Sequence, residues 1–203
     1  ERRQKLLEEA KQEVQEEPEN VNKIVRLAEL YREEGQVREA MKLLEDAHKR
    51  MPDNYQLRER LGDLRLSAGE NALKKVRRQL EEDPENEKLQ AREEKLENKC
   101  RQLAVREYKW RVKQHPTDRE LRLKLGYAQY EMGNLQEAIS AFQQAARDPR
   151  LEKEAAMMMG RCFMQKGQHD VAEEQFRRAI DRHEQFDERG MELHYDLGRA
   201  LEE

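Results

Sequence analysis

Few residues in this sequence are of the types that perform catalysis or bind metals, and those few are not grouped. The chain has 203 residues, including five histidines and two cysteines. No histidine stands in a metal-binding spacing, and no serine or cysteine stands in a recognisable nucleophile context. Two thiols without a spacing motif form neither a disulfide framework nor a zinc site. The residues concerned are His48, His115, His169, His183, His194, Cys100 and Cys162. We therefore predict no catalytic site, no metal site and no cofactor.

A run of methionines at 157–159, followed by Met164, raises the question of a soft-metal site, because thioether sulfur is polarizable. Helical spacing separates these side chains. Met159 falls in a core position beside Gly160, whereas Met157 and Met164 lie seven residues apart on another face. We therefore favour core packing and the lining of a binding surface over metal binding.

The composition is that of a helical protein with an extensive surface. Charged residues make up 41% of the chain, against about 25% in typical soluble domains. The 40 basic and 44 acidic residues are interspersed and give a net charge of -4, which excludes a strong overall attraction to nucleic acid or to an anionic membrane. No apolar run approaches the roughly 20 residues that span a bilayer, and no signal-peptide core begins the chain. We expect an all-α, cytoplasmic protein with no membrane insertion.

Proline and small residues divide the chain at regular intervals. Successive prolines are 34, 32, 32 and 33 residues apart, and pairs of small residues seven apart recur between them. Proline cannot continue a helix, and the second glycine of a pair can adopt the left-handed conformation that ends one. The prolines are Pro18, Pro52, Pro84, Pro116 and Pro149, and the pairs are Ala28/Gly35, Gly62/Gly69, Gly126/Gly133 and Gly160/Gly167. This pattern predicts an array of helical hairpins.

Residues 21–54 show the repeating unit most clearly. Leu27, Ala28 and Tyr31 share one face of an expected first helix, which Gly35 ends. The expected second helix has a matching apolar face and stops before a proline; its residues are Ala40, Leu44, Ala47 and Pro52. This pattern resembles the tetratricopeptide repeat, a helix-turn-helix hairpin with a period of about 34 residues. The resemblance implies a right-handed superhelical α-solenoid of such hairpins. Because residues 86–114 contain neither Gly nor Pro, we expect one long helix in its middle.

We predict that residues 1–203 form a single array. The chain begins with Glu rather than Met and ends within a helical pattern, so we expect a fragment of a longer array, with any targeting segment outside it. The predicted boundaries are 1–20 for a partial repeat helix, 21–54 for repeat one, 55–86 for repeat two, 87–118 for a degenerate repeat fused into the long helix, 119–152 for repeat four, 153–190 for repeat five and 191–203 for a truncated sixth repeat.

The middle of the array departs from the pattern. For residues 55–86 we predict a hairpin with a shortened turn near Gly69. Residues 86–114 contain neither Gly nor Pro, which predicts one continuous helix. Apolar residues spaced seven apart form a row that suggests a coiled coil. A coiled coil needs a second apolar row beside the first, and the residues in that companion row are basic. We therefore favour packing against adjacent repeats over dimerisation. The apolar row is Leu89, Leu96, Leu103 and Trp110, and the companion row is Arg92, Lys99 and Arg106.

The resemblance implies that a peptide or protein segment binds in a concave groove lined by the first helix of each repeat. The positions three before, one after and four after each small residue share a helical face. Towards the amino end this face is acidic, with Glu29, Glu59 and Asp63. Towards the carboxyl end it is aromatic, apolar and basic. The predicted groove residues are Leu123, Tyr127, Tyr130, Met157, Arg161, Met164, Tyr195 and Arg199. We expect a segment with apolar residues and an acidic group to bind there.

These observations predict a non-catalytic scaffold for protein interactions. The Lys/Asn clamp by which some family members hold chaperone carboxyl termini is absent, because Val25, Glu29, Leu123 and Tyr127 occupy its positions. One alternative is a regulatory or substrate-recruiting segment of a larger enzyme or secretion assembly. Another is a module that self-associates through an open end of the array or through the long helix.

Overall fold

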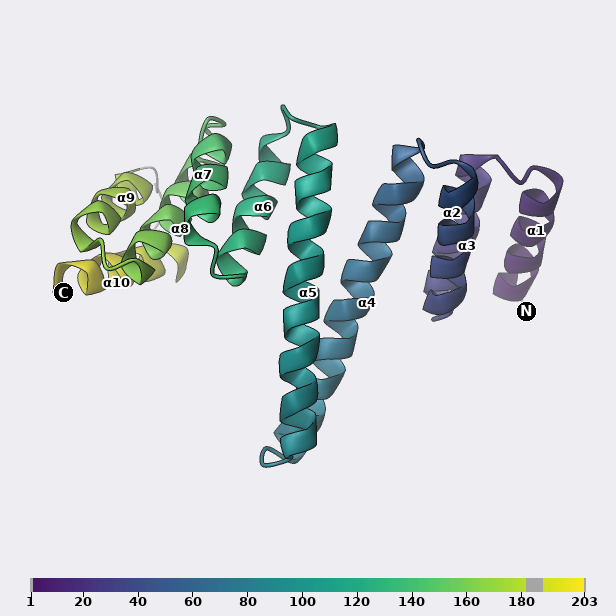
Figure 1. Ribbon diagram of the computed structural model, residues 1–203, viewed down its shortest axis with the longest axis horizontal. Coiled ribbons are helices and arrows are strands. Elements are labelled where there is room, and N and C mark those ends of the chain that lie inside the picture. The colour runs from purple at the N-terminus through teal and green to yellow at the C-terminus, as the bar shows by residue number, and fades with distance from the viewer. Residues whose placement is uncertain (1, 182–187, 203) are drawn as a thin grey trace. The chain divides into compact units, whose positions relative to one another are not determined.

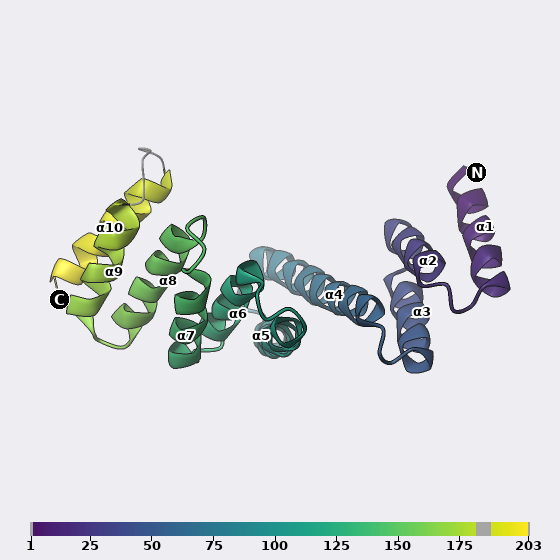
Figure 2. The same ribbon diagram turned by 90° about the horizontal axis from the view of Figure 1, so that it is seen from above.

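The computed structural model describes residues 2–181 and 188–202, and these ranges form helices and no strand (Figure 1, Figure 2). The predicted all-α fold is therefore confirmed. The helices are α1 (Arg2–Glu16), α2 (Val21–Glu33), α3 (Val37–Arg50), α4 (Tyr55–Glu82), α5 (Glu87–Gln114), α6 (Arg119–Glu131), α7 (Leu135–Ala145), α8 (Glu152–Gln165), α9 (His169–Asp181) and α10 (Glu188–Glu202). They belong to two compact units, Glu1–Cys100 (unit 1) and Arg101–Glu203 (unit 2).

In unit 1, α2 and α3 form a hairpin around a shared apolar core. The turn between them contains Gly35 at a φ of 74°, a left-handed conformation that favours glycine. Ala28 on α2 and Ala40 and Leu44 on α3 are buried, so small residues let the two helices approach closely. The glycine in the turn and the buried small residues therefore determine the formation of this hairpin.

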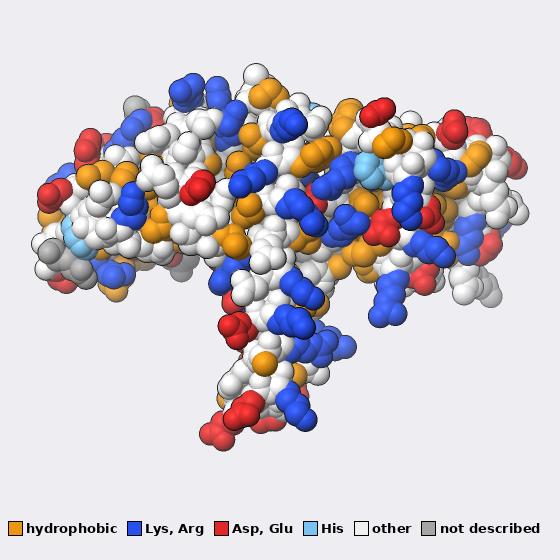
Figure 3. Space-filling model, viewed as in Figure 1, with side chains coloured by type: hydrophobic (Ala, Val, Ile, Leu, Met, Phe, Trp, Pro, Cys, Tyr) orange, Lys and Arg blue, Asp and Glu red, His pale blue; other side chains and the backbone are white. Residues whose placement is uncertain are grey.

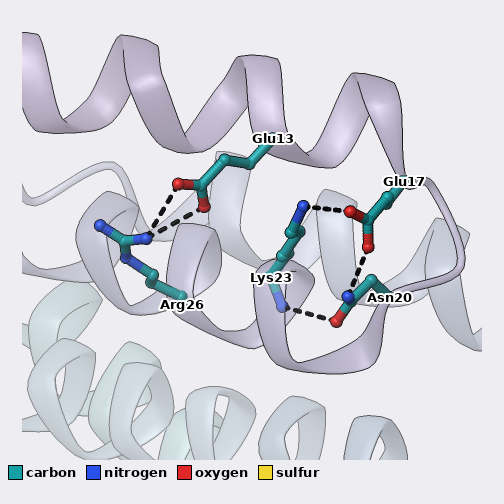
Figure 4. Close-up of polar contacts among 5 residues, drawn as sticks. All are labelled: Glu13, Glu17, Asn20, Lys23 and Arg26. Carbon is teal, nitrogen blue, oxygen red and sulfur yellow. Dashed lines mark hydrogen bonds and ion pairs between the residues drawn. The ribbon is translucent and has the colours of Figure 1, made fainter.

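Polar contacts join α1 to α2 (Figure 4). The Asn20 side chain accepts a hydrogen bond from the backbone N–H of Lys23 and so caps the start of α2. Lys23 Nζ donates to Glu17 at 2.6 Å, and this bond lowers the pKa of the Glu17 carboxyl. Arg26 Nη1 lies 3.0 Å from one carboxylate oxygen of Glu13. The end of α1 is thus tied to the first turns of α2.

In unit 2, α6 packs against α7, α8 against α9, and α10 against both α9 and α8 (Figure 2). Gly126 on α6 and Gly160 on α8 face the rings of Phe142 and Phe176, respectively. A Cβ atom added at either glycine would lie 2.5 Å from a ring carbon. The absence of a side chain at each glycine therefore lets a fully buried phenylalanine fill the space between the two helices of its hairpin.

The predicted hairpin at 55–86 is wrong, because α4 continues through Gly69 without a turn. In the three hairpins that do turn, the glycine has a positive φ, whereas Gly69 does not and the helix continues through it. Gly69 instead lies against the next helix, where an added Cβ would be 2.8 Å from Cys100 Sγ. The glycine here serves a close approach between helices rather than a turn.

The predicted continuous helix at 86–114 is present as α5. Its first half runs beside the second half of α4 and forms a two-helix hairpin, residues 67–100, which we call the arm (Figure 1). Since α4 has 28 residues and α3 has 14, the arm extends roughly 20 Å beyond the length of α3. Arg77 on α4 donates to Glu93 at 2.7 Å and to Glu97 at 2.9 Å.

These contacts correct the expected companion row of α5. Glu93 and Cys100 face α4, and Leu96 lies between them on the same helical face. The predicted companion residues Arg92 and Lys99 lie beside this face and are exposed. The leucines spaced seven residues apart on this part of α5 therefore lie at the interface between two helices of the same chain.

No helix in the described ranges is long and apolar enough to cross a membrane.

Candidate binding groove in unit 2

Four helices of unit 2 contribute to one cavity: α6, α8, α9 and α10. Tyr130 lies near the end of α6, Arg161 and Met164 lie in the second half of α8, and Arg199 lies in the last turn of α10. All four were predicted groove residues, and all four line a cavity of about 340 Å³. Its remaining lining residues are Gln165, His169, Phe176 and Asp196. The structure thus brings together half of the predicted set.

The two arginines of this cavity differ in their partners. Arg161 Nε donates to Asp196 at 2.7 Å, and its Nη2 lies 3.6 Å from a carboxylate oxygen of Glu192. Both carboxylates are on α10, so Arg161 ties α8 to α10. Arg199 is exposed and forms no ion pair with any residue in the described part of the chain. Arg199 is therefore the better placed of the two to bind a carboxylate from outside.

Tyr130 offers a polar group beside an apolar wall. Its hydroxyl accepts a hydrogen bond from Gln165 Nε2 at 2.7 Å. Burial raises the pKa of this hydroxyl, so Tyr130 stays neutral across the physiological range and can donate its proton to a ligand. The half-buried Met164 packs against the core of unit 2 and supplies flexible apolar surface. The cavity can therefore accept an apolar side chain together with an anionic group.

The other predicted groove residues lie outside this cavity. Leu123 is only 7% exposed and packs in the core of unit 2, so its predicted position on the groove surface is wrong. The Tyr127 hydroxyl bonds Glu154 at 2.6 Å, and its ring meets Phe142 edge-on at 5.5 Å. Met157 is half-buried against the same core. Tyr195 is 68% exposed on α10.

Sequence reasoning missed Asp196 and Gln165. Asp196 follows the predicted Tyr195, and Gln165 follows the predicted Met164. Comparison of neighbouring repeats could have found Asp196, because a carboxylate on one first helix stands 35 residues after Arg161 on the previous one. Opposite charges about one repeat apart on adjacent first helices are well placed to pair.

Unit 1 has a cavity of its own, of about 280 Å³, lined by residues of α2, α3 and α4. Its charged lining is mixed, with the acidic Glu29 and Asp63 and the basic Arg32 and Arg60, whereas an acidic face was predicted for this end of the chain. Arg60 Nη1 lies 3.7 Å from Glu29. The apolar part of the lining consists of aliphatic side chains, and all of them are buried; they are Val25, Ala28, Leu44 and Leu64. This cavity therefore combines a charged rim with an apolar floor.

The two thiols differ in exposure. Burial raises the pKa of Cys162 to about 12 and also raises the pKa of the half-buried Cys100. Among the described residues, no group of three potential ligands could hold a metal ion, and His183 lies outside those residues.

We expect iodoacetamide to leave Cys162 unmodified in the folded chain, because the reactive thiolate is scarce at about pH 8 when the pKa is near 12. Cys100 should react slowly, and both should react in urea, where the pKa returns to about 8.5. Peptide mass spectrometry at timed intervals measures this. Equal modification rates for the two thiols in the folded chain would contradict the expectation.

Comparison with known proteins places these features in a family. A family model described as tetratricopeptide repeat matches residues 101–152, 123–185 and 157–203, and a second model with the same description matches residues 24–54. No curated protein matches the chain.

Among solved structures, "Crystal structure of MamA" is 17% identical, with 87% of this chain and 85% of that chain covered and a TM-score of 0.57. "MamA RS-1 ArsTM double mutant" is 18% identical, with 89% and 84% covered and a TM-score of 0.59. At such identity the likeness concerns the fold alone.

Proposed function

Because the chain belongs to the tetratricopeptide repeat family, we propose that it is a non-catalytic interaction scaffold whose unit 2 binds a protein segment against α6, α8 and α10. Helical-repeat arrays offer extended concave surfaces for binding, which supports the general role. The observation that carries the specific proposal is the shared cavity of Tyr130, Met164 and Arg199, which come from three successive first helices.

The ligand we propose is an extended or helical protein segment with an apolar side chain and a carboxylate. Met164 and the ring of Tyr130 would contact the apolar side chain, and the guanidinium of Arg199 would bind the carboxylate through two parallel hydrogen bonds. Arg161 would act differently, because its Nε is already bonded to Asp196. We assign Arg161 to holding α8 and α10 at the spacing that forms the cavity.

Tyr130→Ala combined with Arg199→Ala is expected to weaken binding at least about tenfold, because aromatic and arginine anchors often dominate such interfaces. The probe is the tightest-binding peptide from an array of apolar and acidic peptides screened with the full chain. Fluorescence anisotropy gives its Kd. Circular dichroism and the fluorescence of Trp110, the single tryptophan, check that the double variant stays folded.

Glu29→Ala combined with Asp63→Ala serves as the matched change in unit 1, since both residues line the cavity there. We expect this variant to bind the peptide as the unaltered chain does. If affinity survives the change in unit 2 and falls with the change in unit 1, the proposed groove is wrong. If no peptide from the array binds, the proposed ligand class is wrong.

A further inference from the structure

The arm carries its positive charges on one side. On α5, four basic residues follow one another at intervals of four, three and four, a spacing that places them in a line along the helix. All four are exposed; they are Lys88, Arg92, Lys95 and Lys99. The acidic residues of this part of α5 are Glu87, Glu93, Glu94 and Glu97. At about 100° per residue, none of these acidic residues falls in the basic line.

Lys75 on α4 extends this positive surface. It stands two positions before Arg77, and Lys95 stands two positions before Glu97. Arg77 and Glu97 form a hydrogen bond on one side of the arm. A residue two positions earlier is rotated by about 160° about the helix axis, so Lys75 and Lys95 lie on the other side. We call Lys75, Lys88, Arg92, Lys95 and Lys99 the basic flank. Figure 3 shows blue basic side chains along the α4–α5 hairpin and red acidic ones at its tip.

The cations of the basic flank lack partners within the described chain. No hydrogen bond or ion pair joins any of their side chains to a described residue, whereas Arg77 on the other side binds two carboxylates. The cations of the basic flank thus form no ion pairs within the described ranges, although the same part of α5 contains four glutamates. The same spacing continues in the sequence at Arg106, Lys109 and Lys113, which are also exposed.

The seam of the arm is also incompletely covered. Among residues 67–100, only Val76 is buried, and the leucines of the two helices are half-buried. These leucines are Leu73, Leu80, Leu89 and Leu96. Two helices alone leave such side chains partly in water, and a third helix packed along them would remove that exposure.

We propose that the basic flank binds an acidic amphipathic helix of another protein, which adds a third helix to the arm. Carboxylates at intervals of three and four residues on that helix match the spacing of the flank, about 5 Å per step, and a neighbouring apolar row covers the half-buried leucines. Half-buried leucines contribute nothing to phosphate binding, and residues 67–100 contain no aromatic side chain on which a base could stack. A second copy related by a twofold axis would bring the basic flank against itself.

The test uses the full chain and a synthetic helical peptide with leucines in one row and glutamates beside it at intervals of three and four. Fluorescence anisotropy is expected to show binding that weakens as salt is raised, because exposed charges are screened. A scrambled peptide of the same composition should bind at least about tenfold more weakly, because its charges no longer form a line. Arg92→Glu, Lys95→Glu and Lys99→Glu together should weaken binding of the helical peptide by at least about tenfold, because three attractions become repulsions.

The matched control reverses three other exposed cations, Lys42→Glu, Lys74→Glu and Arg78→Glu, which lie outside the basic flank. It should change the affinity by no more than about threefold, through net charge alone. Binding of the scrambled peptide equal to that of the helical one, or an equal loss in both triple variants, overturns the proposal. So does tighter binding of duplex DNA or of phosphatidylserine vesicles, or a dimer in sedimentation that the flank variant abolishes.

Discussion

Phe176→Ala is expected to lower the free energy of unfolding of unit 2 by about 3–5 kcal/mol. Phe176 is 0% exposed, and its ring fills the space in front of Gly160, where no side chain can replace it. Urea unfolding followed by Trp110 fluorescence measures the effect, because Trp110 belongs to unit 2.

Val171→Ala on the same helix is the control for Phe176→Ala. Val171 is 37% exposed, so its truncation should cost less than about 1 kcal/mol. Similar losses for the two variants would show that the Phe176 ring contributes far less to the packing of α8 on α9 than its burial indicates.

A single substitution, glycine to alanine, is expected to have opposite effects at different helical positions. At Gly126 and Gly160 the added Cβ would lie 2.5 Å from a buried phenylalanine ring, so we expect a loss of about 1–3 kcal/mol. At Gly198, on α10, nothing lies within 4 Å of an added Cβ. Alanine should there raise the free energy of unfolding by about 0.5–1 kcal/mol, because it lowers the backbone entropy of the unfolded chain.

A double-mutant cycle identifies the cause of the loss at Gly126. Phe142→Leu removes the ring that the new methyl group meets, so Gly126→Ala should cost less in the Phe142→Leu chain than in the unaltered one. If the two costs are equal, the loss at Gly126 does not come from contact with Phe142. If Gly198→Ala destabilises the chain as Gly126→Ala does, the loss does not come from helix packing at all.

The sequence predicts the hairpins well because their determinants are local. A glycine with a positive φ ends the first helix at Gly35, Gly133 and Gly167, and a small residue seven positions earlier sets the helix spacing. Gly69 shows the limit of this reasoning. It has the same spacing from a preceding glycine, but its role depends on Cys100, which reaches it only through the fold.

The candidate groove was predictable in part, for a geometric reason. The position four after the small residue points into a cavity in several repeats, as Arg32, Tyr130 and Met164 do. At the position three before it, Val25 and Leu123 are buried, whereas Tyr195 is 68% exposed. The three predicted positions share one helical face, but part of that face lines the cavity and part is buried in the core. The rotation of each helix about its axis, relative to its neighbours, determines which part is which.

The partners of the arginines could not be predicted from one repeat. Arg161 and Arg199 occupy the same predicted position, one after a glycine, in successive first helices. Asp196 and Glu192 on α10 bind Arg161, whereas no residue in the described ranges pairs with Arg199. The chemistry at each position thus depends on which helix follows it.

The seven-residue period of the arm makes its reach adjustable. Seven residues advance a helix by about 10 Å and close to two turns, so adding or removing seven in both α4 and α5 would lengthen or shorten the arm while its seam still faces inward. The α2–α3 hairpin would be untouched, since the change falls beyond it in the chain. Changes of three or four residues in one helix alone would instead shift the register at which Arg77 meets Glu93 and Glu97. Insertion or deletion of whole seven-residue segments in both helices would therefore change the length of the arm and leave the neighbouring hairpins unaltered.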